Sequence, residues 1–211
     1  IDMGNIPTLS VAATTGDIYL NFLNNDMASS DFTGVSAGGD INLGVTDYDF
    51  EFDDNTFTGL TNDFSLIANN IYLSSGSGSI ETLGDVTLKA TNGVIEETNW
   101  DDIIDITGNN LIMQATDGIS GDNGIWTSVS ELTADVTGEL TTGNIYLQNN
   151  KDLIVNGLSN AGTGDIYLYN TTAGTNETMI IDGNVITSNG GDIEIATNGG
   201  LTINANITSN D

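Results

Sequence analysis

The sequence of 211 residues contains no cysteine, no histidine and no arginine, one proline, and only two lysines, Lys89 and Lys151. Without cysteine the chain forms neither disulfides nor thiolate metal sites. Without histidine and cysteine, the usual nucleophilic catalytic triads are excluded. Two isolated lysines cannot neutralise a phosphate backbone, which excludes nucleic acid as a partner. No apolar run approaches the roughly 18 residues that span a bilayer, so membrane insertion is not expected.

What the chain has in abundance is acid, glycine and short aliphatic clusters. It carries 30 aspartates and glutamates, a net charge of −28, 26 glycines and 38% hydrophobic residues. Such a composition disfavours helices but supplies enough apolar surface for a core. The acidity has two interpretations: solubility in salty surroundings, or loosely held divalent cations, of which Ca²⁺ best suits oxygen ligands. The sequence requires no cofactor, and Ca²⁺ is the only candidate.

One phrase recurs along the chain: Gly or Asn, then Asp or Asn, then an aliphatic residue, any residue, and a second aliphatic residue. Eight copies lie about 25 residues apart on average, a spacing typical of solenoids. The copies begin at Gly16, Gly39, Asn69, Gly84, Asn109, Gly143, Gly164 and Gly191.

The chemistry of a copy predicts a short strand after a tight corner. Side chains alternate faces along a strand, so both aliphatic residues point the same way. Glycine beside Asp or Asn supplies the corner, which we expect to be left-handed in places. We expect equivalent aliphatics to line one interior column: Ile18, Leu20, Ile41, Leu43, Ile145, Leu147, Ile166, Leu168, Ile193 and Ile195.

These features predict an all-β fold, a right-handed parallel β-helix with three short strands per coil. An antiparallel β-sandwich would also show frequent turn signals, but it does not explain one phrase returning in the same order. We expect residues 1–211 to form a single β-helix segment, with irregular insertions near 47–62 and 96–103.

An acidic strand is predicted around residues 47–53. Asp47, Asp49, Glu51 and Asp53 alternate with aromatic residues, so one face is acidic and the other buried. The four carboxylates are a candidate Ca²⁺ site, although they lack the spacing of a helix-loop-helix calcium loop. The alternative is a solvated strand face.

A second candidate site combines Trp100 with Asp101 and Asp102. A tryptophan beside acids can stack on a sugar ring, so these residues are a candidate sugar site. The alternative is a tryptophan that fills a corner of the coil. Trp126 has the same two interpretations.

The pattern Gly-Asp-Ile-x-Leu, followed by Leu-x-Val or Leu-x-Ile and a short third strand, resembles the coils of filamentous haemagglutinin-like adhesins. Residues 143–208 show it best. The resemblance implies a large bacterial surface or secreted protein that acts as an adhesin, a stalk or a biofilm component. This chain lacks the amino-terminal secretion region of that family and is far shorter, which predicts a section of a longer protein.

Enzymes also occur on parallel β-helices, but a lyase needs a basic residue and this chain has only two scattered lysines. Chance acid pairs such as Asp101 and Asp102 or Asp53 and Asp54 are weak candidates for a hydrolase. We therefore expect a non-catalytic, structural and adhesive section of an extracellular fibre. Its expected partners are copies of itself or flanking repeats, end to end, and glycans or a cell surface. The alternative is a carbohydrate-binding β-helix module.

Overall fold

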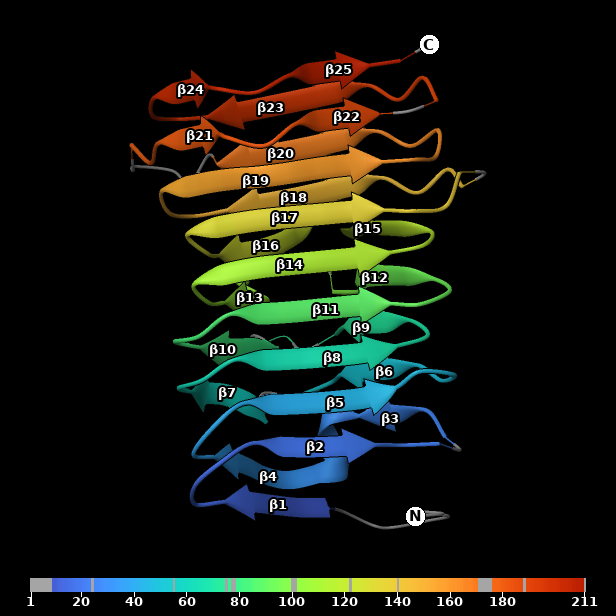
Figure 1. Cartoon of the computed structure of the whole chain (residues 1–211), viewed down its shortest axis with the longest axis vertical. Coiled ribbons are helices and arrows are strands. Elements are labelled where there is room, and N and C mark those ends of the chain that lie inside the picture. The colour runs from blue at the N-terminus through green and yellow to red at the C-terminus, as the bar shows by residue number, and fades with distance from the viewer. Residues whose placement is uncertain are drawn as a thin grey trace.

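The computed structural model of the chain is a parallel β-solenoid of about eight turns (Figure 1). It describes residues 9–23, 25–54, 56–74, 76, 79–99, 102–121, 123–139, 141–170, 176–187 and 189–210. In Figure 1 the near strands run from left to right and each coil lies above the one before it, so the solenoid is right-handed. The parallel β-helix predicted from the sequence is confirmed.

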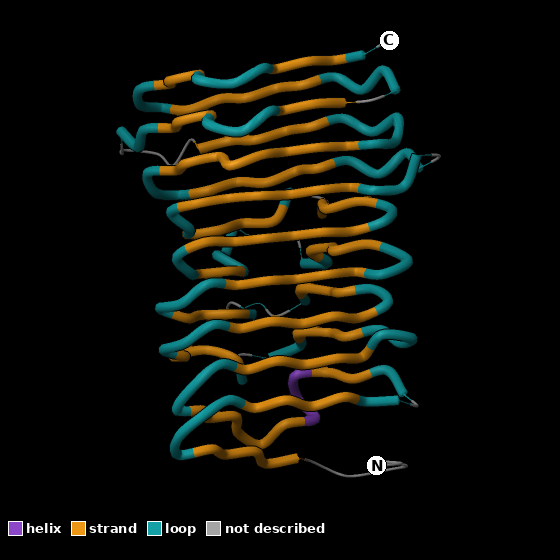
Figure 2. Tube along the Cα trace, viewed as in Figure 1, coloured by secondary structure: helices purple, strands orange, loops and turns teal. Residues whose placement is uncertain are grey.

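The near side of the rod is an 11-stranded sheet to which every coil contributes (Figure 2). Its strands are β2 (Ile18–Asn21), β5 (Ile41–Val45), β8 (Phe64–Ala68), β11 (Val86–Ala90), β14 (Asn110–Ala115), β17 (Glu131–Val136), β19 (Leu153–Asn160), β21 (Met179–Ile181), β22 (Val185–Thr187), β24 (Leu201–Ile203) and β25 (Ile207–Ser209).

The far side is a 12-stranded sheet. Its strands are β3 (Met27–Ala28), β6 (Phe50–Phe52), β7 (Phe57–Leu60), β9 (Ile71–Leu73), β10 (Ile80–Thr82), β12 (Val94–Glu97), β13 (Ile106–Thr107), β15 (Gly118–Gly121), β16 (Ile125–Ser128), β18 (Ile145–Asn149), β20 (Ile166–Asn170) and β23 (Ile193–Thr197). A separate pair joins β1 (Leu9–Ala13) to β4 (Phe32–Ala37), and a 3₁₀ turn, η1, covers Ser29–Asp31.

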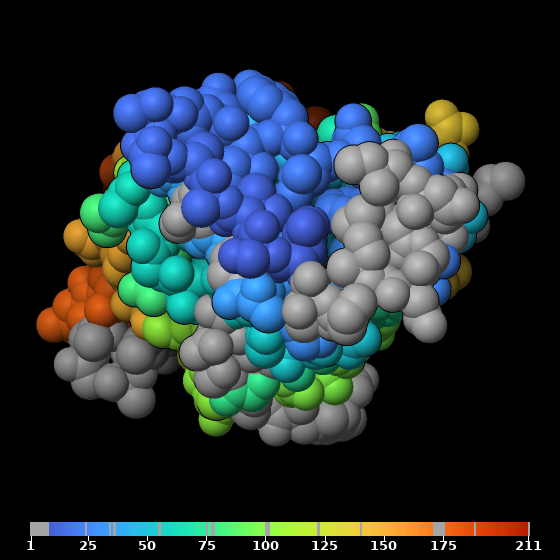
Figure 3. Space-filling model, turned by 90° about the horizontal axis from the view of Figure 1, so that it is seen from below, coloured from blue at the N-terminus to red at the C-terminus, as the bar shows by residue number. Residues whose placement is uncertain are grey.

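All pairs between described strands are parallel, and equivalent residues of successive coils lie side by side. Each coil therefore rises by about one inter-strand spacing, roughly 4.8 Å. Viewed from the N-terminal end, the first coils cover much of the later ones, as expected for coils stacked in line (Figure 3).

The coil changes shape at β18. In the four coils that begin with β5, β8, β11 and β14, three separate strands follow one another. Strand β18 pairs with β15 through Ile145 and with β16 through Leu147, so one strand continues two earlier columns. Strand β19 shows the reverse on the other sheet, where it follows the single strand β17 and is followed by both β21 and β22.

The expectation of one interior column is wrong, because the repeated phrase occupies two sheets. Ile18 pairs with Ile41 in the 11-stranded sheet, whereas Ile145 pairs with Ile166, and Ile166 with Ile193, in the 12-stranded sheet. The phrase marks any strand that follows a tight corner, and each coil has more than one such corner. Within each column the aliphatic side chains do stack inward, as predicted.

The core is a continuous stack of aliphatic and aromatic side chains inside the coils. All six phenylalanines are buried, and their rings form one contact cluster in the first coils. Phe57 lies at its centre, with ring centroids 5.2 Å from Phe64 and 5.4 Å from Phe32. Edge-on and tilted ring contacts of this kind add to the stabilisation from burial.

Most glycines of the phrase are required by close approach of neighbouring coils. Only Gly16 among them has a positive φ, of 87°. A Cβ added to Gly164 would lie 2.0 Å from the carbonyl oxygen of Gly143, and one added to Gly191 would lie 2.1 Å from that of Gly164. The left-handed corner expected in places is therefore found at Gly16. At the later glycines of the phrase the missing side chain matters more than the freedom of φ.

The Asp or Asn of the phrase links successive coils. Asp17 Oδ1 accepts a hydrogen bond from the backbone N–H of Asp40 at 3.0 Å. The same bond recurs from Asp63 to Asp40, from Asp85 to Asp63 and from Asn110 to Asp85. Since each side chain accepts from the following coil, this ladder has a direction along the rod axis. Every bond in it gives a partner to a backbone donor at the edge of a strand.

Two stretches, 47–62 and 96–103, were expected to be irregular insertions between coils. Residues 47–62 contain β6 and β7, which pair with strands of neighbouring coils. Residues 96–103 begin within β12, and two of them, Trp100 and Asp101, lie outside the described residues.

Candidate functional site

The acidic strand predicted around residues 47–53 has the expected two faces. Phe50 and Phe52 are fully buried, and Glu51 between them is exposed. Glu51 accepts a hydrogen bond from Ser74 Oγ at 2.7 Å. Asp49 Oδ1 accepts hydrogen bonds from the backbone and the side-chain amide of Asn70. These carboxylates therefore bond to the next coil, as the corner aspartates do.

Asp53 bonds in the opposite direction, to η1 of the coil before it. Its carboxylate accepts hydrogen bonds from Ser29 Oγ at 2.9 Å and from the backbone N–H of Ser30 at 2.8 Å, as well as from Ser30 Oγ. Partial burial alone would raise the pKa of Asp53, but the hydrogen bonds from Ser30 and Ser29 outweigh it and lower that pKa below the usual value.

Asp49 and Glu51 share a hollow of about 520 Å³ with Asp26, Asp31 and Tyr72. Burial, and then the surrounding carboxylates with Asp49 foremost, raises the pKa of Tyr72. Within the described ranges, however, no three acidic side chains converge to hold a metal ion. Asp47 is exposed. The calcium site at Asp47, Asp49, Glu51 and Asp53 therefore stays a prediction.

Of the predicted sugar site, only Asp102 is described, because Trp100 and Asp101 lie outside the described residues. Asp102 is exposed, and its Oδ1 accepts a hydrogen bond from Asn123 Nδ2 at 3.0 Å. The backbone carbonyl of Asn123 in turn accepts a hydrogen bond from Gln148 Nε2 at 2.6 Å. Asp102 is thereby connected to the outer surface of β18.

That outer surface carries a group of aromatic residues, of which the sequence analysis singled out only Trp126 as a candidate for sugar stacking. Along one row, Trp126 of β16 pairs with Gln148 of β18, which pairs with Tyr169 of β20. In the next row, Tyr146 of β18 pairs with Tyr167 of β20. We call Trp126, Tyr146, Tyr167 and Tyr169 the aromatic face.

The rings of the aromatic face contact one another at fixed angles. The Tyr146 ring centroid lies 5.7 Å from those of both Tyr167 and Tyr169, at interplanar angles of 64° and 78°. The Tyr146 ring also lies against the backbone of Gly124, where an added Cβ would come within 2.8 Å of Tyr146 Cδ2. Gly124 has a φ of +80°, so the glycine permits both the turn and the ring above it.

Carboxylates lie beside two of the tyrosines and raise the pKa of their hydroxyls. Tyr167 donates its hydroxyl hydrogen to Asp165 Oδ2 at 2.7 Å, and this bond, together with burial and nearby carboxylates, raises the pKa of Tyr167 to about 12. Burial and then a hydrogen bond with Glu194 raise the pKa of Tyr169. Both rings are therefore neutral phenols, with their orientation fixed from the edge of the sheet.

The type of aromatic residue differs between the inside and the outer surface of the rod. Every phenylalanine is in the core, whereas the three tyrosines and the tryptophan of the aromatic face project from the outer surface and are only partly buried. Alternation along Gly-Asn-Ile-Tyr-Leu and Gly-Asp-Ile-Tyr-Leu could have predicted that Tyr146 and Tyr167 point outward. It could not show that they are neighbours, because the same phrase also places Tyr19 on the other sheet.

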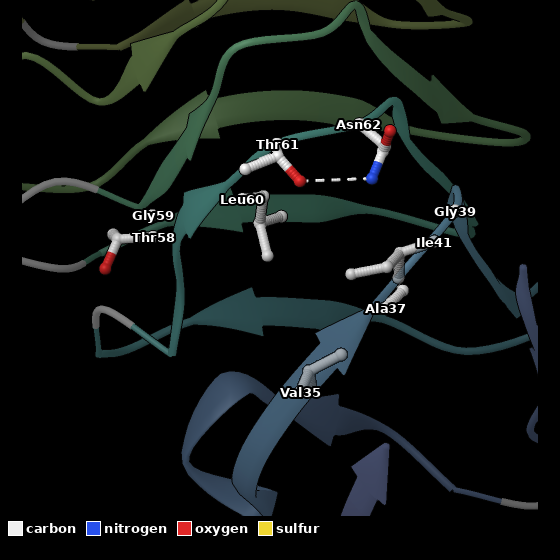
Figure 4. Close-up of a pocket in the computed structure, with 9 residues that line it drawn as sticks. All are labelled: Val35, Ala37, Gly39, Ile41, Thr58, Gly59, Leu60, Thr61 and Asn62. Atoms are coloured by element: carbon white, nitrogen blue, oxygen red, sulfur yellow. Dashed lines mark hydrogen bonds between the residues drawn. The ribbon is translucent and has the colours of Figure 1, made fainter. Parts of the chain in front are cut away.

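A small hollow of about 100 Å³ opens near the N-terminal end, between β4 and β7 (Figure 4). Strand β4 pairs with β1 and strand β7 with β10, and the hollow lies between the two pairs. The nine lining residues include no acid and no base, and Asn62 donates a hydrogen bond to Thr61 within the wall. The hollow therefore has a concave, partly apolar wall, but it contains no group for acid–base chemistry.

Comparisons of the chain with protein-family models, with curated proteins and with solved structures gave no match. No helix in the described part of the chain is long and apolar enough to cross a membrane.

Proposed function

We propose that this chain is a structural, adhesive section of a long extracellular fibre on a bacterial surface or in a surrounding matrix. The observation that carries the proposal is the exposure of the last described coil. Its inward side chains Leu201, Ile203 and Ile207 are 43%, 50% and 40% exposed, whereas their partners in β21 and β22 are fully buried. A further coil stacked on β24 and β25 would bury them in the same way.

The backbone of the last coil supports the same proposal. Among the described strands, β24 and β25 pair only with β21 and β22, so one backbone edge of each is open. Open strand edges template the addition of further strands. At the neighbouring corner, Asp192 donates its backbone N–H to Asp165 Oδ1 at 2.8 Å. A following coil would give the Asp192 carboxylate the equivalent donor.

The high acidity suits a fibre that must grow along its axis without aggregating sideways. A net charge of −28 repels neighbouring rods wherever their sides approach. End contacts are made by backbone hydrogen bonds and aliphatic side chains, so they are less affected by that repulsion. The adjoining coil would come from another copy of this chain or from flanking repeats.

The resemblance to filamentous haemagglutinin-like adhesins supports a secreted or cell-surface location and a role in adhesion, as a stalk or as a matrix component. We propose that the chain is non-catalytic. Reducing-sugar release or unsaturated products from a panel of glycans, lost on Asp101→Asn or Asp102→Asn, would contradict this part of the proposal.

The fibre proposal is tested by negative-stain microscopy and light scattering of the purified chain over a range of concentrations. We expect end-to-end rods whose mass rises with concentration, and loss of these rods in Ile203→Lys. The matched control is Ile154→Lys, because Ile154 is also exposed but lies on the outer face of β19. A wild-type chain that is monomeric at all concentrations, or equal effects of the two variants, would overturn the proposal.

A further inference from the structure

We infer that the aromatic face formed by Trp126, Tyr146, Tyr167 and Tyr169 is a binding surface for a neutral polysaccharide. This inference is independent of the fibre proposal, because it concerns the side of the rod rather than its end. It also differs from the sugar site predicted at Trp100, since its rings come from β16, β18 and β20.

The residue types of the aromatic face match the surface of a sugar. A sugar ring has an apolar face of C–H groups and an edge of hydroxyls, so it combines stacking on aromatic rings with hydrogen bonds to polar side chains. Tyrosine provides both kinds of contact, whereas phenylalanine provides only the first. The indole N–H of Trp126 is buried, so Trp126 provides stacking alone. In this chain every phenylalanine is buried, and half of the six tyrosines lie on this face.

Polar partners lie beside the rings. Gln148 lies between Trp126 and Tyr169 in the same row, and its Nε2 is fixed by the carbonyl of Asn123. Asp165 holds the hydroxyl of Tyr167, and Glu194 lies close enough to Tyr169 to raise the pKa of that phenol. Because the rings contact one another and the hydroxyl of Tyr167 is held by Asp165, these side chains lose little conformational freedom when a ligand stacks on them. A small loss of conformational freedom favours binding.

Charge decides the class of glycan. Asp165 and Glu194 border the aromatic face, and the chain carries 30 acidic residues against two lysines. An anionic polysaccharide would be repelled and would find no guanidinium or imidazole group to bind its carboxylates or sulfates. A neutral polysaccharide has no such penalty.

The direction of the rows suggests how the glycan lies. Tyr146 and Tyr167 are one coil apart, as are Gln148 and Tyr169, so the rings repeat along the rod axis at about the spacing of strands, roughly 4.8 Å. This rise is close to the length of one sugar ring. A polysaccharide lying along the axis would therefore meet successive aromatic rings with successive sugars.

The test is affinity electrophoresis of the intact chain through gels containing soluble neutral polysaccharides: mixed-linkage β-glucan, xyloglucan, galactomannan and dextran. Gels with polygalacturonate and alginate form the anionic arm. We expect at least one neutral polysaccharide to retard the wild-type chain and neither anionic one to do so. Tyr167→Ala should weaken the retardation by about tenfold, the usual effect of removing one central aromatic contact.

The matched control is Tyr19→Ala. Tyr19 donates its hydroxyl to Asp17, two residues earlier, as Tyr167 does to Asp165, but it projects from β2 on the other sheet and is 72% exposed. We expect Tyr19→Ala to bind as the wild type does. Tyr167→Phe keeps the ring and should retain most of the binding. Circular dichroism melting of each variant separates loss of binding from loss of fold.

A second measurement does not depend on removing a ring. In Trp100→Phe the only remaining tryptophan is Trp126, and titration with neutral hexasaccharides of the retained glycan should shift its fluorescence emission. No retardation on any neutral gel would overturn the inference. So would retardation that is equally weakened by Tyr19→Ala and Tyr167→Ala, binding restricted to the anionic gels, or Trp126 emission that does not respond. Rod formation in the microscope should be unchanged in Tyr167→Ala, so failure of one proposal is distinguishable from failure of the other.

Discussion

At the scale of single residues, the same phrase performs two tasks in several of its copies. Its Asp or Asn accepts a hydrogen bond from the next coil, and its glycine allows that coil to approach. Gly143 shows the second task most clearly, because a Cβ there would lie 1.4 Å from the carbonyl oxygen of Asp117. No rotation of a side chain relieves such an overlap with backbone.

Gly143→Ala should therefore lower the free energy of unfolding of the rod by about 1–3 kcal/mol or more, since about 1–3 kcal/mol is the usual cost of overpacking. Gly157→Ala is the control, since a Cβ at Gly157 would have its nearest neighbour at 3.8 Å, in ordinary contact. Urea unfolding followed by circular dichroism compares the two. Equal stability of the two variants would show that coil spacing does not require Gly143.

Asp53 gives a prediction for pH. Its pKa is lowered in the folded chain from the ordinary value of 3.8, so its contribution to stability is fully present above that value and is lost as the pH falls through the folded pKa. Because the side chain is exposed to solvent, we expect Asp53→Asn to cost only about 0.5–1 kcal/mol at pH 7.

The difference between Asp53→Asn and wild type should shrink below pH 3.8 and vanish at lower pH. Urea titrations at pH 7, 4 and 2.5 measure it. The control is Asp47→Asn, because Asp47 is exposed and has no hydrogen-bond partner within the described ranges. A difference that grows with acid would contradict the assigned hydrogen bonds.

At the scale of elements, the sequence predicted the strands and their parallel stacking but not their assignment to sheets. Two copies of one phrase look alike whether they follow the first or the second corner of a coil. The structure also contains a copy that the aliphatic pattern missed, Asn62-Asp63-Phe64, because phenylalanine takes the place of isoleucine. Burial of Phe64 in β8 depends on the phenylalanine cluster, which brings together residues from three coils.

The candidate sites show the same limit. Alternation correctly placed Phe50 and Phe52 inside and Glu51 outside, since that depends only on neighbouring residues. The aromatic face depends on the register between β16, β18 and β20, which is set by the lengths of the loops that join them. No local pattern in the sequence contains that information.

Phe57 tests the importance of the phenylalanine cluster. Its ring contacts four others, so Phe57→Ala should cost about 3–5 kcal/mol. Phe57→Leu retains much of the volume and should cost clearly less. Thermal melting of the two variants measures the difference. Similar melting temperatures would mean that the aliphatic volume retained in Phe57→Leu contributes little, which would contradict this prediction.

At the scale of the whole molecule, charge opposes the folded state. Within the compact rod, 28 uncompensated negative charges repel one another. At 0.1 M, salt screens the repulsion between exposed charges that are more than about 10 Å apart. We expect the melting temperature to rise with sodium chloride. A further rise with Ca²⁺ at fixed ionic strength, reversed by chelator, would support the predicted calcium site.

Replacement of Asp47, Asp49, Glu51 and Asp53 by their amides is the control for that site. If Ca²⁺ binds there, the Ca²⁺-dependent rise should disappear while the sodium chloride effect is retained. A melting temperature that does not respond to Ca²⁺ would leave screening alone, and one that responds to neither would contradict both interpretations.

The central claim is that another coil stacks on the last described coil. Hydrogen–deuterium exchange of residues 201–209, measured by mass spectrometry at increasing protein concentration, tests it most directly. We predict that amides of β24 and β25 become more protected as concentration rises, while those of β11 and β14 in the middle of the rod do not change. Exchange in β24 and β25 that is independent of concentration would contradict the claim.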